Sequence, residues 1–329
     1  MEKILQEITT KKAELDQLKP LPKALEQNLE DWYRIELTYT SNAIEGNTLS
    51  RQDTALVVEK GLTVEGKTLR EHQEAVNHAE AFDYIKELAK IKKRKDLNER
   101  DILAIHALIL RHIDDQNAGK FRNVAVRIAG SQAILPNPLK VPDLMEDFTK
   151  WLKTSRDHPV KIAADTHFKL VSIHPFTDGN GRTARLLMNL ILFQEGYPPA
   201  IIRKEDRRIY LNAIEKAQLT GKLDDYCEII YKAEERSLAM NLEMAKPEEY
   251  GKNKKIALKK LLKIGELAKL ASESVSTIRF WTNEDLLKVA KHTKGGYALY
   301  AQEQVEMSKK IRQLQDKKRL TIEEIKKRV

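Results

Sequence analysis

Apolar residues recur at helical spacing through most of the chain, and this periodicity limits the possible folds more than any other feature. A repeat of about 3.6 residues gathers apolar side chains on one helix face, which must then be buried. It predicts eight helices, at residues 25–39, 69–91, 99–112, 141–155, 162–173, 181–194, 207–219 and 224–245. We therefore expect a mainly α-helical protein.

One segment, residues 123–135, has the pattern of a β-strand pair. Val124, Val126 and Ile128 alternate with other residues, and Gly130 and Ser131 suit a turn. The pattern predicts a short β-hairpin that packs over helices, because an isolated hairpin is only marginally stable. Such a hairpin either holds a peptide by strand addition or is a plain connection.

Size and composition indicate a globular protein. The chain has 329 residues, 41% hydrophobic, which suggests two or three domains. The longest apolar runs, such as residues 186–193, are too short to span a bilayer, so we expect no membrane partner. The N-terminal sequence lacks the apolar core of a signal peptide, which predicts a cytoplasmic protein. The single cysteine, Cys227, excludes an internal disulfide, and we expect it in a helix core.

Positive charge is concentrated near the C-terminus. Residues 251–329 contain 20 Lys and Arg residues against nine Asp and Glu residues, whereas residues 1–250 have a net charge of −2. The polar stretch 245–255, which contains Pro247 and Gly251, predicts a linker before this basic region. The asymmetry is typical of a nucleic-acid-facing domain, with a solubilising lysine-rich end as the alternative.

The stretch 174–187, HPFTDGNGRTARLL, combines residues suited to phosphate chemistry. Gly179, Asn180 and Gly181 enter a helix, where glycines let backbone N–H groups approach a phosphate and the helix N-terminus adds partial positive charge. Arg182 and Arg185 share one face of that helix and can clamp phosphates, although surface arginines are the plainer alternative. No Lys-Ser or Lys-Thr pair follows the second glycine, which excludes a P-loop.

His174 and Asp178 add a base and a cation ligand to this stretch. The near-neutral pKa class of histidine suits a general base, although a lone histidine is often structural. Asp178 suits Mg²⁺ that bridges nucleotide phosphates. A calcium loop is excluded because its twelfth position would need a glutamate, and here it is Asn189.

Residues 174–185 resemble the signature of the Fic family, HPFxDGNGRxxR, at every expected position. The order of the family extends from about residue 41 to residue 242, with Glu74 and Asn77 on one helix and residues 119–122 before the hairpin. The resemblance implies a helical core with a β-hairpin flap. It also implies a nucleotidyltransferase that moves AMP from ATP to a hydroxyl side chain of a target protein (AMPylation).

The resemblance assigns expected roles to individual residues. His174 would be the base, Asp178 would hold Mg²⁺ and Arg185 would hold the γ-phosphate. The remaining expected nucleotide contacts are Gly179, Asn180, Gly181 and Arg182 at the phosphates, with Tyr210, Leu211 and Gln218 near the adenine. The expected target-binding residues of the flap are Ile128, Ala129, Gly130, Ser131 and Gln132. Relatives often carry two tyrosines where this chain has Ile209 and Tyr210.

A second motif, Ser41 to Gly46 (SNAIEG), resembles the inhibitory helix of the family. Glu45 would end a helix that Gly46 caps, and its carboxylate could pair with Arg185. The glutamate would then take the place of the γ-phosphate. An ordinary capped helix end is the alternative. In some relatives the same glutamate supports removal of AMP from a modified protein.

The basic region resembles a MerR-type winged helix. A helix at 264–270, a turn and a second helix from about Ser276 predict a helix-turn-helix, residues 295–300 a wing, and residues 321–325 a further helical stretch. The resemblance implies that Ser276, Thr277, Arg279 and Tyr297 approach DNA. The usual arginine of the wing is Ala298 here, and dimerisation or target binding is the alternative.

We therefore expect three parts: a helical region at 1–95 that includes the inhibitory helix, a Fic core at 96–245, and a linker with a winged-helix domain at 246–329. The favoured function is self-inhibited AMP transfer to a Ser, Thr or Tyr hydroxyl group, with ATP and Mg²⁺. The alternatives are AMP removal, or a DNA-binding regulator whose Fic core senses ATP. Besides the target protein, the expected partner is DNA at 251–329, and a homodimer is left open.

Overall fold

The computed structural model describes residues 1–246, 261–293, 297–301, 303–318 and 322–326. The chain divides into two compact units, Met1–Ala245 and Lys246–Val329. Most of the expected linker lies outside the described residues, as do Gly295 and Gly296 of the expected wing and Thr321.

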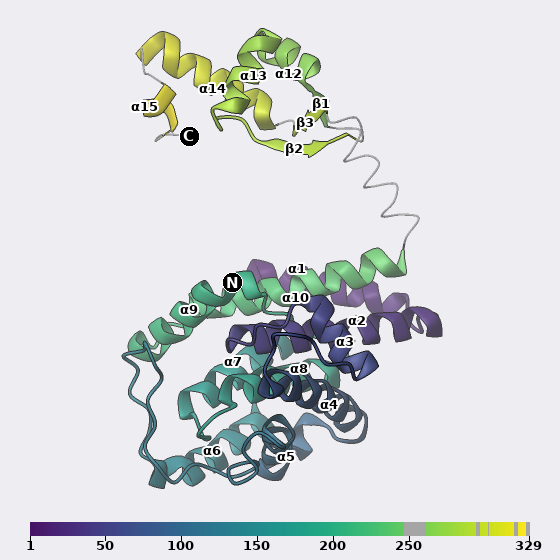
Figure 1. Cartoon of the computed structure of the whole chain (residues 1–329), viewed down its shortest axis with the longest axis vertical. Coiled ribbons are helices and arrows are strands. Elements are labelled where there is room, and N and C mark those ends of the chain that lie inside the picture. The colour runs from purple at the N-terminus through teal and green to yellow at the C-terminus, as the bar shows by residue number, and fades with distance from the viewer. Residues whose placement is uncertain (247–260, 294–296, 302, 319–321, 327–329) are drawn as a thin grey trace. The chain divides into compact units, whose positions relative to one another are not determined.

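The first unit is built from helices (Figure 1). All eight predicted helices are confirmed, with ends within five residues of those expected; two further ones, α1 and α3, were not predicted. A signal for α3 was present, since Ser50 and Asp53 form a capping box at its start. The helices are α1 (Glu2–Gln17), α2 (Lys23–Ile44), α3 (Arg51–Lys60), α4 (Leu69–Ile91), α5 (Glu99–Leu110), α6 (Val141–Thr154), α7 (Pro159–Ile173), α8 (Asn180–Gln194), α9 (Arg207–Thr220) and α10 (Asp224–Ala245).

Helix α8 is the core of this unit. Every residue from Arg182 to Leu192 is buried, and α8 packs against α4, α5 and α7. A helix buried all round has little freedom to tilt, because each neighbouring side chain fills the adjacent space. It therefore holds the motif at its N-terminus rigidly.

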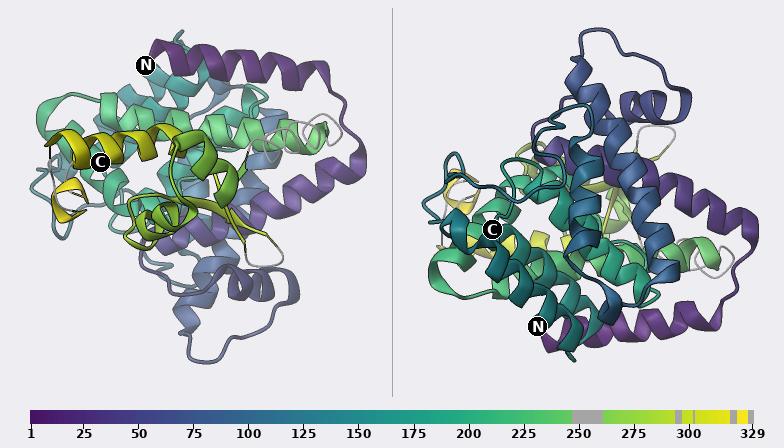
Figure 2. Two further views of the ribbon diagram at one scale, coloured as in Figure 1. Left: turned by 90° about the horizontal axis from the view of Figure 1, so that it is seen from above. Right: turned by 90° about the horizontal axis from the view of Figure 1, so that it is seen from below.

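The N-terminal helices belong to the same unit. Helix α1 packs along α10, and α2 packs against α4 and α8. Figure 2 shows α1 and α2 as two long purple helices, the second of which folds back from the end of the first. Residues 1–95, which we expected as a separate region, thus pack directly onto residues 96–245.

The prediction of paired strands at residues 123–135 is wrong. The segment makes a turn, with the Ser131 N–H donating to Ile128 O (3.1 Å), but its two arms form no β-ladder anywhere in this fully described segment. Arg122 bonds both arms instead, donating to Val124 O (3.0 Å) and Pro136 O (2.7 Å). A side chain therefore takes backbone acceptors that a strand ladder would have used. The result is an irregular loop between α5 and α6 (Figure 1).

The second unit contains a three-stranded antiparallel sheet and a helix-turn-helix. Its sheet has the order β1 (Leu262–Lys263), β3 (Ala298–Tyr300), β2 (Val289–His292). Helices α12 (Ile264–Ala271) and α13 (Val275–Asn283) precede β2, and α14 (Glu303–Lys318) and α15 (Ile322–Lys326) follow β3. The two predicted helices of the helix-turn-helix are confirmed.

Buried aromatic side chains hold this second unit together. Trp281 and Tyr300 are each 1% exposed and lie in one apolar cluster with Ile278 and Ile311. Arg312 donates two hydrogen bonds of 2.6 Å to Glu273, and its guanidinium lies over the Trp281 ring. The unit therefore has its own core.

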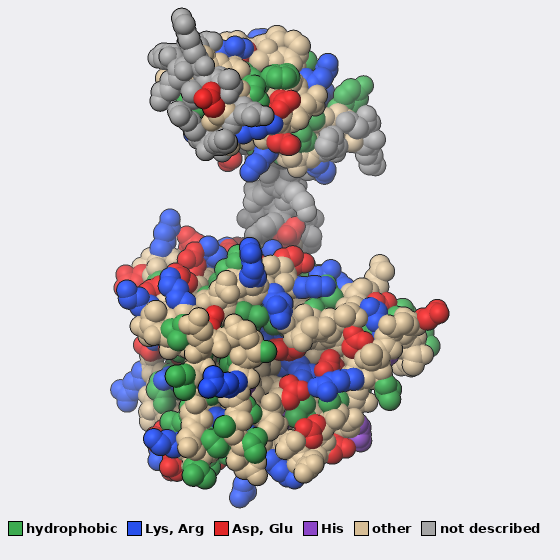
Figure 3. Space-filling model, turned by 60° about the vertical axis from the view of Figure 1, so that its left-hand side comes forward, with side chains coloured by type: hydrophobic (Ala, Val, Ile, Leu, Met, Phe, Trp, Pro, Cys, Tyr) green, Lys and Arg blue, Asp and Glu red, His purple; other side chains and the backbone are tan. Residues whose placement is uncertain are grey.

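Charged side chains are scattered over the visible surface. On the face in Figure 3, basic and acidic side chains are interspersed with apolar ones. In the described part of the chain, no helix combines the length and the apolar character that a membrane span needs.

Candidate active site

His174 lies at the end of α7 with its free nitrogen prepared to accept a proton. Its backbone is left-handed (φ 52°), which is uncommon for a residue with a Cβ, and Arg122 Nε donates to its carbonyl oxygen (2.8 Å). Nδ1 lies 3.2 Å from Val171 O, which can only accept, so the ring proton is on Nδ1 and Nε2 is free. Burial lowers the pKa of His174, so the ring is neutral at neutral pH.

Two side chains hold the loop between α7 and α8. The His106 ring stacks on Phe176 at 3.6 Å between centroids, and its Nε2 donates to Asp178 O (3.0 Å). Asn180 brackets Phe176, accepting from its N–H (3.0 Å) and donating to its carbonyl oxygen (2.9 Å). The Asn180 side chain is therefore used inside the loop, and only its backbone can face a phosphate. Sequence analysis missed His106, whose only signal was a histidine on an apolar helix.

The glycine cradle at the start of α8 is filled by a carboxylate. A Cβ atom on Gly181 would overlap Glu45 Oε1 and lie 3.0 Å from Arg185 Nη1. Position 181 therefore accommodates only glycine, because any side chain there would overlap Glu45. Because a helix N-terminus attracts anions, the Glu45 carboxylate lies where an anionic ligand would be favoured.

Arg185 is bonded to the end of α2. Its Nε donates to Ser41 Oγ (2.8 Å), and Nη2 donates to Ser41 O (3.0 Å) and Glu45 Oε1 (2.7 Å). Helix α2 ends at Ile44, and Gly46 follows Glu45 with φ 103°. Burial works against the charge of Arg185, but Glu45 holds its pKa above the ordinary value. The contact expected from the sequence is thus present in the structure.

Helix α4 contributes a second set of charges to the site. Arg70 Nη2 donates to Asp178 Oδ2 (2.9 Å), and Glu74 Oε1 lies 3.3 Å from Arg182 Nη1. The sequence indicated no role for Arg70, and it indicated Glu74 only as part of the family's order of residues. Arg70 and Glu74 lie four residues apart, and charged pairs with this spacing are common on helix surfaces.

Arg182 retains unused donors. Its side chain is 3% exposed, its Nε has no hydrogen-bond partner in the part of the chain that the structure describes, and its Nη1 has only the 3.3 Å ion pair with Glu74. Buried donors without acceptors are costly, so an anionic ligand there would be stabilised.

Asp178 suits a cation that is shared with a ligand. Its side chain is 48% exposed, which leaves carboxylate oxygens accessible. Among the described residues, no group of three or more His, Cys, Asp or Glu side chains could hold a metal ion without help. Mg²⁺ is commonly bound by one or two carboxylates together with substrate phosphates, so these residues fit it.

The three expected adenine contacts differ in their exposure. Tyr210 is 1% exposed, and its hydroxyl lies 2.7 Å from His167 Nε2, so its side chain is buried in this structure and its expected adenine contact stays a prediction. It is buried because α9 turns this side chain inward toward α7. Gln218 is partly exposed and donates to Ser172 Oγ (3.4 Å), while Leu211 is 38% exposed.

The flap residues are accessible at the tip of their loop. Ala129, Gly130 and Gln132 are exposed or partly so, as is Ile128. Glu215 of α9 accepts hydrogen bonds from Ser131 Oγ (2.9 Å) and the Gln132 N–H (2.6 Å). This contact anchors the tip, and the sequence gave no sign of it.

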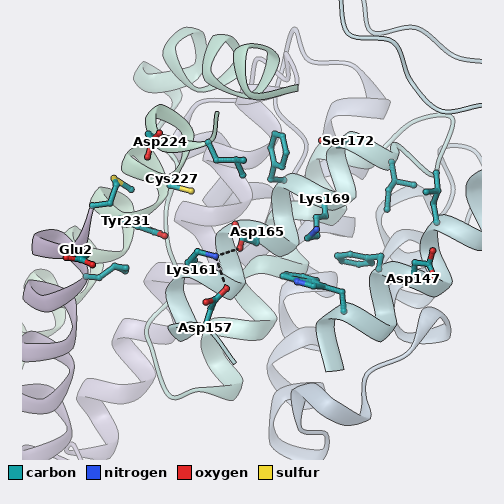
Figure 4. Close-up of a pocket in the computed structure, with 18 of the residues that line it drawn as sticks. Glu2, Asp147, Asp157, Lys161, Asp165, Lys169, Ser172, Asp224, Cys227 and Tyr231 are labelled. Carbon is teal, nitrogen blue, oxygen red and sulfur yellow. Dashed lines mark hydrogen bonds and ion pairs between the residues drawn. The ribbon is translucent and has the colours of Figure 1, made fainter. Parts of the chain in front are cut away.

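A separate groove lies between α6, α7 and the N-terminal ends of α1 and α10. It has a volume of about 1040 Å³ and is lined by aromatic side chains that include Trp151 and Phe168. Lys161 bonds Asp157 (2.8 Å) and Asp165 (2.9 Å) at its edge (Figure 4). No polar residue of the 174–185 motif lines it, so it is distinct from the phosphate cradle.

In the second unit, the expected DNA contacts gather at the start of α13. Ser276 and Arg279 are exposed, and Thr277 is partly exposed. Ser274 caps the helix by accepting from the Thr277 N–H (3.0 Å). Tyr297, before β3, is 74% exposed.

Comparison with protein families gives two matches. The model of the Fic/DOC family matches residues 96–192, and that of the MerR HTH family regulatory protein matches residues 262–329. Similar curated proteins are named "Protein adenylyltransferase Fic". The one from Aedes aegypti is 39% identical over 211 residues, covering 63% of this chain and 42% of its own length. The one from Nematostella vectensis is 40% identical over 204 residues, covering 61% and 47%. The chain thus spans less than half the length of these relatives.

Solved structures share the fold of the first unit. Fic-1 from C. elegans is 31% identical, with a TM-score of 0.67 over 75% of this chain and 73% of its own. A Fic domain containing signaling protein from Bacteroides thetaiotaomicron is 28% identical, with a TM-score of 0.66 over 74% of this chain and 98% of its own.

Proposed function

The chain belongs to the Fic family, and from this membership we propose that it is a protein adenylyltransferase held inactive by its own Glu45. In the proposed reaction, AMP passes from ATP to the hydroxyl group of a Ser, Thr or Tyr side chain of a target protein. The observation that carries this proposal is the Glu45 carboxylate, which lies in the glycine cradle and bonds Arg185 (2.7 Å).

The reaction follows from the state of His174. Its free Nε2 takes the proton of the target hydroxyl group, and the oxygen attacks the α-phosphorus of ATP. The bond from the α-phosphorus to the bridging oxygen breaks, and pyrophosphate leaves. The exposed tip of the flap, near Gly130, positions the target segment.

The phosphates are received by donors that are already in place. The unpartnered Nε–H of Arg182 and the backbone of Gly179 to Gly181 face the chain of phosphates, and Arg185 takes the γ-phosphate. Asp178 would hold Mg²⁺, which would neutralise phosphate charge. Arg70 must then release the Asp178 carboxylate.

The same geometry explains the proposed inhibition. Glu45 and the γ-phosphate require the same Arg185 donors, and two anions cannot share them without strong repulsion. The inhibitory carboxylate thus comes from the end of α2, whereas Arg185 belongs to α8.

The test uses ATP labelled at either the α- or the γ-phosphorus. The full chain with Glu45→Gly, Mg²⁺ and a cell lysate should retain the α-label on protein and release the γ-label. His174→Ala in the same background should abolish labelling, because no group accepts the proton. Retention of the γ-label on protein would indicate phosphoryl transfer and refute the proposal.

A second candidate function, removal of AMP from a modified protein, rests on the same glutamate. The Glu45 carboxylate acts against the burial that lowers the pKa of His174, so its charge is felt at the proposed base. An AMP-modified target should then lose AMP with the wild-type chain and not with Glu45→Gly.

For the second unit we propose DNA binding through Ser276, Thr277, Arg279 and Tyr297. Its support is the match to MerR regulators and the exposure of these residues. Contacts from Lys and Arg to phosphates would supply most of the affinity.

A further inference from the structure

The groove beside α6 and α7 is lined by one face of each of these helices (Figure 4). On α7 the lining residues recur at helical spacing, so a single stripe of that helix follows the groove. They are Lys161, Asp165, Phe168, Lys169, Ser172 and Ile173. The stripe on α6 consists of Leu144, Asp147, Phe148 and Trp151. The volume of about 1040 Å³ lies at the upper end of the range for small-molecule sites, roughly 300–1,000 Å³, so a larger ligand fits.

One end of the groove lies beside the proposed base. The stripe on α7 ends at Ser172 and Ile173, directly before His174. Pro136, the residue after the flap, lines the same groove, and its carbonyl oxygen accepts from Arg122 Nη2 (2.7 Å). The Nε of the same guanidinium donates to His174 O (2.8 Å). A polypeptide whose hydroxyl group lies at His174 is therefore adjacent to this end of the groove.

The side chains that line the groove carry an excess of negative charge. Five of them are carboxylates and two are lysines. One of the lysines, Lys161, is already bonded to both Asp157 (2.8 Å) and Asp165 (2.9 Å). Asp147 and Asp224 are exposed, and in Figure 4 they lie on opposite sides of the groove. Carboxylates separated in this way favour a ligand with positive charges along its length, such as a basic polypeptide.

Aromatic rings form the apolar part of the groove. Trp151 and Phe168 are both partly exposed, so their rings keep accessible surface. The Lys169 ammonium lies over the Trp151 ring, 4.7 Å from its centre, because the face of an aromatic ring attracts a cation. Aromatic faces with carboxylates around them bind a large apolar side chain that has Lys or Arg as its neighbour.

We propose that this groove binds the target protein, at a segment that carries apolar and basic side chains near the acceptor hydroxyl group. The proposal rests on the proposed function, and it adds the class of target. From Lys161 to Ser172, α7 rises roughly 16 Å, which an extended chain spans with about five residues. The groove therefore selects targets by side chains within about five residues of the hydroxyl group, beyond the reach of the flap.

The test measures transfer of α-labelled AMP to the proteins of a dilute cell lysate by the full chain with Glu45→Gly and Mg²⁺. Asp147→Lys together with Asp224→Lys reverses two charges of the groove and should lower the rate of labelling roughly tenfold. Glu146→Lys together with Asp225→Lys is the matched control. These two exposed carboxylates are the chain neighbours of the first pair and do not line the groove, so the control should keep the rate.

Two further measurements separate target binding from other roles of the groove. Affinity for an ATP analogue whose α–β bond cannot be cleaved should be equal in both double variants, because the groove is distinct from the phosphate cradle. A short peptide with a tryptophan between lysines should inhibit labelling by the Glu45→Gly chain. Replacement of its lysines by glutamates, or of its tryptophan by serine, should remove the inhibition.

Equal labelling by the two double variants would overturn the proposal and leave the proposed function intact. A parallel loss of nucleotide affinity in the groove variant would also overturn it, because the defect would then lie at the phosphates. So would a groove variant that is monomeric where the control is dimeric, since a second copy of the chain would then occupy the groove. If Glu45→Gly labels no protein although it binds the nucleotide, the proposed function fails, and the target site falls with it.

Discussion

Arg185 is a residue for which two anions compete. Its donors are used by Ser41 and Glu45, and the proposed γ-phosphate requires the same donors. A charge-assisted hydrogen bond contributes about 1.5–3 kcal/mol, so the glutamate is a strong competitor. The balance at this one guanidinium sets the proposed activity.

A prediction at the residue scale concerns His174. Burial lowers its pKa, so the neutral form that acts as a base persists to lower pH than for an ordinary histidine. We expect kcat/KM of the Glu45→Gly variant to fall to half at a pH below about 6.5. An acid limb centred at or above that pH would contradict the geometry at His174.

Some contacts of single residues in the site could be predicted from the sequence, and others could not. The pairing of Glu45 with Arg185 could be predicted, because both belong to recognisable motifs. The contacts of Arg70 with Asp178 and of His167 with Tyr210 could not be predicted, because the partners come from distant segments. Only the packing of α4, α7 and α9 around the site brings these groups together.

At the scale of elements, the end of α2 is the part that must move. Gly46 has φ 103°, and a Cβ added there meets no atom within 4 Å. Gly46→Ala would therefore act through backbone strain, about 1–2 kcal/mol, and not through a clash. We expect it to loosen Glu45 and to raise AMP transfer several-fold over wild type.

Gly61→Ala is the matched control. Gly61 also follows a helix with positive φ (63°) and open space around the missing Cβ, but it ends α3. It should lower thermal stability similarly and leave AMP transfer at the wild-type level. Equal activation by both variants would mean that general destabilisation, and not the end of α2, controls the site.

The flap is an element whose structure could be predicted from the sequence only in part. Its Gly130–Ser131 pair correctly indicated a turn, but strand pairing depends on which partners the backbone groups meet nearby. Arg122 and Glu215 supply those partners from outside the segment. The helices were predictable because their hydrogen bonds are internal.

At the scale of the whole molecule, the chain joins a Fic unit to a unit with a MerR-type match. Residues 251–329 hold 20 basic and nine acidic residues, so the excess positive charge belongs to the second unit. This division could be predicted from the sequence, because composition changes sharply between the units.

The DNA proposal predicts a salt dependence. Binding of the full chain to a mixed-sequence duplex should weaken linearly on a log–log plot against salt, and Arg279→Ala should reduce the slope by about one. Lys309→Ala is the control, because its ammonium is paired with Glu306 (2.9 Å). No duplex binding at low salt would refute the proposal.

The most direct test of the central claim is the rate of AMP transfer with and without Glu45. Wild type, Glu45→Gly and Glu45→Gly with Arg185→Ala are compared with α-labelled ATP, Mg²⁺ and the same lysate. Loss of one charge-assisted contact predicts a rate increase of roughly 10- to 100-fold for Glu45→Gly, reversed by Arg185→Ala. A Glu45→Gly variant no faster than wild type would contradict the account.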